Sequence, residues 1–209
     1  MSAELIWAVA TDATETNSTA TAAATIPAVA TTAATAATAT TASDKTQKIY
    51  WGPRLWRLFH LLAELSDRRD IHMLWPNLLR ITSVVMPCEA CRVHLAAYLR
   101  SHVFVHFKKS LMITGELVRD RVRTDLLSFH NDVNRRLGKL EWTQAEIMTT
   151  YSVSGTRSRI MILSEVQSIF EELKSIWTPI VHTRIKGGDF NTWKTHVAMM
   201  IALVSGGPN

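Results

Sequence analysis

Two cysteines, three residues apart, are the most reactive feature of this sequence. Cys88 and Cys91 lie in the segment Pro87-Cys88-Glu89-Ala90-Cys91, and the chain of 209 residues contains no other cysteine. They therefore cannot belong to a larger disulfide framework within the chain. Three roles remain open for the pair: a redox-active disulfide, half of a metal site, or two buried thiols without a chemical role.

The spacing of the cysteines places both sulfur atoms on one face of the first turn of a predicted helix, since Pro87 ends the preceding helix. Unpaired backbone N–H groups and the helix dipole favour a thiolate at that position. A lowered thiol pKa is what dithiol exchange requires. His94 adds an imidazole to the same side. The spacing favours redox chemistry and leaves the other two roles open.

A zinc site is the main alternative to redox chemistry. Cys88, Cys91 and His94 would supply three ligands, and a remote His60 or His130 would supply the fourth. The step from Cys91 to His94 is shorter than is usual in zinc modules, and the fourth ligand would come from a distant helix. The alternative function is thus a zinc-stabilised helical binding module.

A predicted helix over residues 116–137 carries polar side chains within its apolar stripe. The stripe consists of Leu126, His130, Val133, Asn134 and Leu137. Buried His130 and Asn134 must find partners, because an unpaired polar group in the interior costs free energy. Trp56 and His60, at helical spacing on another predicted helix, add a flat surface. This pattern permits a cofactor with a planar ring system but does not identify one.

Helical periodicity extends over the remaining folded region, and no strand or hairpin pattern interrupts it. The predicted helices cover residues 53–65, a segment ending at residue 86, and residues 88–101, 116–137, 158–177 and 189–204. Pro76 is expected in the first turn of the second helix, and Gly138 after the end of the helix over 116–137. Gly187 and Gly188 are expected to separate the last two helices.

The N-terminal region has a different composition from the rest of the chain. Residues 8–42 are almost entirely Ala and Thr, which is typical of a disordered tail. We find no secretory signal and no apolar run long enough to span a membrane, so no membrane partner is expected. The formal charge of +5 does not demand a nucleic-acid partner, and none is expected.

Three longer motifs occur in order along the first part of the folded region. They are Gly52-x-x-x-Trp56-x-x-x-His60-x-x-Ala63, then Pro87-Cys88-x-x-Cys91-x-x-His94-x-x-x-Tyr98, then His130-Asn131-x-Val133-Asn134-x-x-Leu137-Gly138-Lys139. Each motif is weak alone, but their combination resembles the Erv/ALR family of sulfhydryl oxidases. The resemblance covers roughly residues 51–142 and favours the oxidase over the zinc module.

The resemblance implies an all-α fold: a four-helix bundle with a short fifth helix, which binds FAD. The expected organisation is a disordered tail over residues 1–45, the FAD-binding bundle over 46–143, and an additional helical segment over 144–209. That last segment is expected to pack on the bundle. Family members usually form dimers through their first two helices, so a homodimer is also expected.

The resemblance also implies roles for individual residues. Cys88 and Cys91 are the catalytic pair, with Cys88 as the outward interchange thiol and Cys91 against the flavin ring. The residues expected to bind FAD are Gly52, Arg54, Trp56, His60, Cys91, His94, His130, Asn131, Val133, Asn134 and Lys139, and no metal is expected. The implied reaction is oxidation of protein dithiols to disulfides, with electrons passing to oxygen to give hydrogen peroxide.

The chain departs from the family in one important way. Many members carry a second, mobile cysteine pair that shuttles electrons, and this sequence has only Cys88 and Cys91. Substrate dithiols must therefore reach Cys88 directly, or a separate thiol carrier must dock there. A shuttle-less sequence with extra helices is similar to the versions encoded by large DNA viruses. That similarity implies a cytoplasmic location, in the host cytoplasm or the virion.

Overall fold

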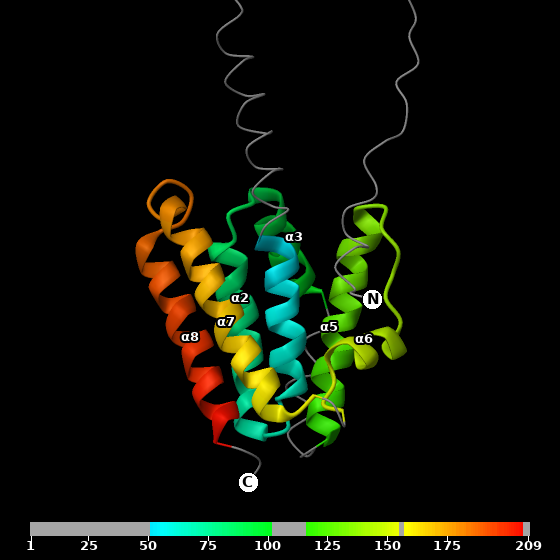
Figure 1. Ribbon diagram of the computed structural model, residues 1–209. Helices are drawn as coiled ribbons and strands as arrows, with labels where there is room; N and C mark the ends of the chain where they lie inside the picture. The colour runs from blue at the N-terminus through cyan, green and yellow to red at the C-terminus, as the bar shows by residue number, and fades with distance from the viewer. Residues whose placement is uncertain (1–50, 102–115, 155–156, 207–209) are drawn as a thin grey trace, which may run out of the picture. The chain divides into compact units, whose positions relative to one another are not determined.

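The computed structural model describes residues 51–101, 116–154 and 157–206, and this part of the chain is built from helices (Figure 1). The helices are residues 51–64, α2 (Arg69–Val85), α3 (Glu89–Arg100), α5 (Glu116–Arg136), α6 (Gln144–Tyr151), α7 (Arg159–Trp177), the short 3-10 turn η3 (Thr178–Ile180) and α8 (Gly187–Ser205). Within these ranges two isolated bridges occur but no β-strand. The all-α prediction is therefore confirmed. The predicted Ala/Thr-rich tail lies outside the described residues.

The helix of residues 51–64, drawn in cyan in Figure 1, lies between α5 and α7. On the α7 side, Trp51 packs edge to face on Trp177, with 6.0 Å between ring centroids. On the α5 side, His60 forms a hydrogen bond with His130. The apolar stripe between these contacts is buried, with Leu58 fully inaccessible to solvent. The helix predicted over residues 53–65 is thus the central element of the bundle.

Pro76 lies inside α2 and not in its first turn, so the predicted position of this residue is wrong. The helix begins seven residues earlier, at Arg69. The Pro76 side chain faces solvent, whereas Ile71 and Trp75 before it and Leu78 after it are buried. Burial on both sides of the proline offsets the hydrogen bond that the proline removes.

Of the two C-terminal helices, α8 packs against α2, and α7 packs against α8. Trp193 of α8 is fully buried and donates from Nε1 to Thr82 Oγ1 of α2 at 3.1 Å. Trp177 of α7 lies 4.7 Å from Trp193 between ring centroids. The expectation that the C-terminal segment packs on the bundle is confirmed, because its buried residues are continuous with the core of the preceding helices.

The ends of the later helices were only partly predicted. Gly138 has φ +64°, as expected of a residue that follows a helix end. Gly187 and Gly188, by contrast, are the first residues of α8 and do not separate it from α7. The short α6 begins with a capping box in which Thr143 and Glu146 satisfy one another's backbone N–H groups. None of the helices in the described ranges is long and apolar enough to cross a membrane.

Candidate redox and flavin site

The two cysteines form a disulfide at the start of α3, with 5.2 Å between their Cα atoms. Cys88 is the N-cap residue of α3, and its Sγ accepts a hydrogen bond from the backbone N–H of Cys91 at 3.2 Å. Pro87 is buried and separates α2 from α3, as the sequence predicted. Both sulfur-bearing side chains are half-buried and pack against the hydrophobic core.

This position gives the two sulfur atoms different environments. The free N–H groups at a helix start stabilise a negative charge on an N-cap side chain. A thiolate on Cys88 would therefore be stabilised by the Cys91 N–H and by the dipole of α3. Cys91 lies within the first turn, on the side of the helix that continues to His94. The geometry is suited to dithiol exchange at Cys88.

His94 is fixed by a carboxylate from α5. Its Nε2 lies 2.7 Å from Asp132 Oδ2, and both side chains are partly buried. The His94 ring also lies 6.0 Å from the Phe129 ring, which in turn lies 5.1 Å from Trp56. Phe129 therefore connects the cysteine-bearing helix to the aromatic residues of the first helix.

A cluster of stacked rings fills the space between the first helix, α5 and α6. Trp56 stacks on His130 with 4.1 Å between centroids and 10° between planes. His60 Nε2 lies 3.0 Å from His130 Nδ1, and the His60 ring stacks on Tyr151 at 4.8 Å. Trp142, in the segment before α6, lies 6.1 Å from His130 in a stacked orientation. The structure thus brings together Trp56, His60 and His130, which the sequence analysis assigned to one site.

The two buried histidines of this cluster are neutral at neutral pH. Burial, together with the charge of His130, lowers the pKa of His60 well below its usual value. Burial, with a smaller contribution from the charge of Lys139, lowers the pKa of His130 to about 3. In the described part of the chain, His60 Nδ1 is buried without a hydrogen-bond partner. A buried polar atom of this kind is a candidate to bind a ligand.

The two predicted asparagines hold the segment that follows α5. Asn131 Nδ2 donates to the carbonyl of Trp142, and the Trp142 N–H donates to Asn131 Oδ1, both at 2.8 Å. Asn134 is buried, and its Nδ2 donates to the carbonyl of Leu140 at 3.1 Å. These amides therefore position Trp142 beside the ring cluster, and Lys139 is exposed on the same turn.

Three other predicted cofactor residues make their contacts outside the ring cluster. Val133, on α5, packs against the hydrophobic core. Arg54 Nε forms an ion pair of 2.6 Å with Glu172 of α7, which directs it toward the C-terminal helices. Gly52 lies in the first helix, and no atom of another segment lies within 4 Å of the place where a Cβ would lie.

Four residues of this site were not predicted from the sequence: Phe129, Asp132, Trp142 and Tyr151. Phe129 and Asp132 flank the predicted His130 and Asn131, so helical spacing offered a signal for them. Trp142 and Tyr151 come from the segment around α6, and only the folded chain shows that they reach His60 and His130.

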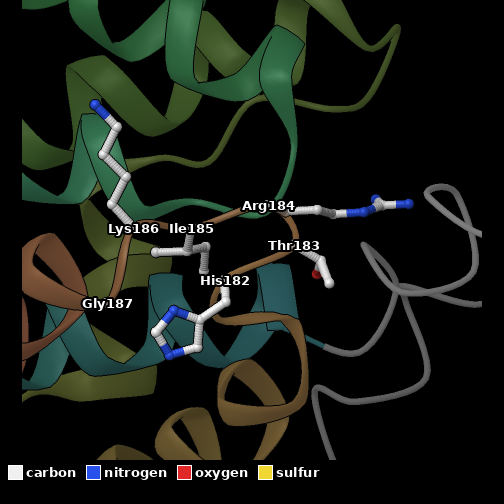
Figure 2. Close-up of a pocket in the computed structure, with 6 residues that line it drawn as sticks. All are labelled: His182, Thr183, Arg184, Ile185, Lys186 and Gly187. Carbon is white, nitrogen blue, oxygen red and sulfur yellow. The ribbon is translucent and has the colours of Figure 1, made fainter.

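The side chains of the ring cluster fit a flavin dinucleotide chemically. They provide flat aromatic surfaces, a buried imidazole nitrogen without a partner, and the basic side chain of Lys139 nearby. The cavity in Figure 2, of about 450 Å³, lies elsewhere and is lined by residues 182–186 of the loop between α7 and α8 and by Gly187 at the start of α8. A planar ligand at the cluster would have to separate or overlie the stacked rings of Trp56 and His130.

The zinc alternative has little support in the geometry. Cys88 and Cys91 are joined in a disulfide and present no thiolate ligands. His94 is paired with Asp132, and His60 and His130 are paired with each other. Within the ranges that the structure describes, no group of three or more His, Cys, Asp or Glu residues is arranged to hold a metal ion.

Comparison with known proteins is consistent with a redox site. Residues 53–152 match the sequence model of the Erv1 / Alr family, which extends past the three motifs to include α6. An FAD-linked sulfhydryl oxidase of African swine fever virus (isolate Pig/Kenya/KEN-50/1950) is 27% identical over 113 residues, which cover 52% of this chain and 87% of the viral protein. Protein 347L of Invertebrate iridescent virus 6 is 25% identical over 92 residues, covering 43% of this chain and 80% of that protein. No solved structure matches at a significant level. The similarity to the Erv1 / Alr family lies in residues 53–152, which make up just under half of the chain.

Proposed function

We propose that this protein is an FAD-dependent sulfhydryl oxidase, which forms disulfides in protein dithiols and passes the electrons to oxygen to give hydrogen peroxide. One observation carries the proposal: the Cys88–Cys91 disulfide lies at a helix start whose next turn, through His94, contacts a buried cluster of aromatic rings. The similar protein of African swine fever virus is named an FAD-linked sulfhydryl oxidase.

The reaction begins with exchange at Cys88. A substrate thiolate bonds to Cys88 Sγ, the Cys88–Cys91 bond breaks, and the electron pair remains on Cys91 Sγ. A second substrate thiolate attacks the substrate sulfur of this mixed disulfide, which forms the substrate disulfide and releases Cys88 as a thiolate. The Cys91 N–H, which already faces Cys88 Sγ, lowers the free energy of that leaving group.

The remaining steps depend on the cofactor site. When bound, FAD would supply the two-electron acceptor needed to re-form the Cys88–Cys91 disulfide, with oxygen as the final acceptor and hydrogen peroxide as the product. Trp56, His60 and His130 would hold its planar parts. Asp132 fixes the orientation of the His94 ring, which lies three residues after Cys91 in α3.

Further residues complete the proposed cofactor site at its edges. Gly52, Arg54 and Val133 would border the cofactor, and Asn131 and Asn134 would shape its adenine and ribose side. Lys139 would neutralise phosphate charge.

Substrates and assembly follow from the composition and the packing. The chain has no second cysteine pair, so protein dithiols or a separate thiol carrier would react at Cys88 itself. A homodimer remains a prediction. The first helix and α2 are partly covered by α7 and α8, which reduces the surface of these two helices that a second copy could contact. We also propose a cytoplasmic location, in a host cell or a virion.

Replacement of either cysteine tests this function. Cys88→Ser and Cys91→Ser should each reduce oxygen consumption with dithiothreitol to the level without enzyme, because each removes one atom of the reacting disulfide. A rate close to wild type in either variant would contradict the assigned roles. Bound flavin without any turnover in the wild-type protein would instead indicate a scaffold that has lost catalysis.

A further inference from the structure

The loop between α7 and α8, residues 178–186, follows the family match and reaches the start of α3. Arg92 makes this connection: its Nη1 donates to the carbonyl of Met86 at 3.0 Å and to the carbonyl of Arg184 at 3.2 Å. Arg92 also forms an ion pair with Glu89. Met86 precedes Cys88 by two residues, and Arg92 directly follows Cys91. A side chain of the disulfide-bearing turn therefore fixes the loop beside that turn.

The backbone of this loop is well defined by its own hydrogen bonds. The His182 N–H donates to the carbonyl of Ile185 at 2.7 Å, and the Arg184 N–H donates to the carbonyl of Ile180 at 3.0 Å. His182 adopts φ +74°, which closes the turn, and Ile185 is buried in the core. A preformed surface of this kind binds a partner with a smaller loss of conformational entropy than a loop that must order.

The side chains of the loop form a basic surface around the cavity of about 450 Å³. Three of the six lining residues, His182, Arg184 and Lys186, are basic types, and none of the six is acidic. The nearest acidic residue along the chain is Asp189, in the first turn of α8. Figure 2 shows that the side chains of Lys186 and Arg184 leave the loop in different directions. A single small anion would not meet both, whereas an extended chain lying along the loop would meet them in turn.

We propose that this loop is the docking surface for an extended, acidic segment of the protein substrate whose dithiol reacts at Cys88. The proposal rests on the function proposed above. Because the chain has no cysteine pair other than Cys88 and Cys91, the substrate itself must come to the start of α3. Contacts with a part of the substrate that does not react raise kcat/KM by holding the dithiol at Cys88. Opposite charges on the two surfaces also accelerate their encounter.

Charge reversal on the loop tests the proposal. The probes are a reduced peptide with a Cys-x-x-Cys segment flanked by aspartates, the same peptide with serines in place of aspartates, and dithiothreitol. In the full-length holoenzyme, Lys186→Glu should lower kcat/KM for the acidic peptide about fivefold relative to the value for dithiothreitol. The serine peptide should show no such change. Added salt should reduce the preference of the wild type for the acidic peptide.

Lys194→Glu is the matched control, since it makes the same charge change two turns further along α8 and away from the loop. For this variant, kcat/KM for the acidic peptide divided by kcat/KM for dithiothreitol should equal the wild-type ratio. The docking proposal is wrong if wild type oxidises both peptides equally well, or if the two lysine variants behave alike. If wild type binds no flavin and oxidises no dithiol, the proposed function itself has failed.

Discussion

Two buried regions of this protein are built from different kinds of side chain. The polar seam, between the first helix and α5, contains the buried residues His60, Glu64, Arg123, His130 and Asn134. The tryptophan core, between α2, α7 and α8, contains Trp177, Trp193, Leu173, Val197 and Met200, all fully buried. The tryptophan core stabilises the fold mainly by apolar burial. The polar seam costs free energy to bury, and its two histidines lie in the ring cluster where we propose that the cofactor binds.

Removal of one indole should show the purely structural role of the tryptophan core. Trp193→Ala deletes a fully buried side chain and its hydrogen bond to Thr82, and should lower the free energy of unfolding by about 3–5 kcal/mol. Urea unfolding monitored by circular dichroism measures this change. The flavin spectrum of the folded fraction should be unaltered. If the variant stays folded but loses its flavin, the tryptophan core also serves cofactor binding, and its purely structural role is contradicted.

The stability of the polar seam should depend on a buried ion pair between Glu64 and Arg123. Glu64 accepts hydrogen bonds from Arg123 and from the Val153 N–H, so it joins the first helix to α5 and to the segment after α6. Glu64→Ala should lower the free energy of unfolding by about 3 kcal/mol, because Arg123 remains buried with fewer partners. Glu172→Ala, which breaks the exposed pair with Arg54, should cost less than about 1 kcal/mol. Equal losses would show that burial does not decide the strength of these pairs.

The neutral histidines predict how stability depends on pH. His130 has a folded pKa of about 3, below the value of about 6.5 for an unfolded histidine. Between these values the unfolded chain binds a proton that the folded chain does not. The free energy of unfolding should therefore fall as pH decreases from 6.5, by up to about 1.4 kcal/mol per unit. Urea titrations at pH 7 and 5 should show a smaller decrease for His130→Gln than for wild type, and parallel curves would contradict the assignment.

The sequence predicted the parts of this architecture that depend on local pattern. Helical spacing located the helix of α5 and indicated that His130 and Asn134 would be buried, and both are. The Pro-Cys-x-x-Cys segment predicted a helix start with both sulfurs on one turn, and Cys88 is the N-cap of α3. In these cases the neighbours along the chain decide the structure.

Features that depend on contacts between distant segments could not be predicted in this way. Pro76 stays inside α2 because of packing on both sides of it, which its local preference does not reveal. The His60–His130 hydrogen bond joins residues that are 70 positions apart. The contact of Arg92 with the Arg184 carbonyl spans 92 positions, and nothing in either local sequence signals it. The contribution of the C-terminal segment to the surroundings of the disulfide therefore became visible only in the fold.

We propose that Cys91 passes electrons to a flavin bound at the ring cluster of Trp56, His60 and His130, and one measurement tests this proposal directly. The purified protein should be yellow, and one equivalent of dithiothreitol added without oxygen should bleach the visible flavin band of the wild type. Cys91→Ser should bind flavin equally but keep its colour, since it lacks the sulfur that donates the electron pair. A colourless wild-type protein, or a Cys91→Ser variant that bleaches as fast as wild type, would contradict this account.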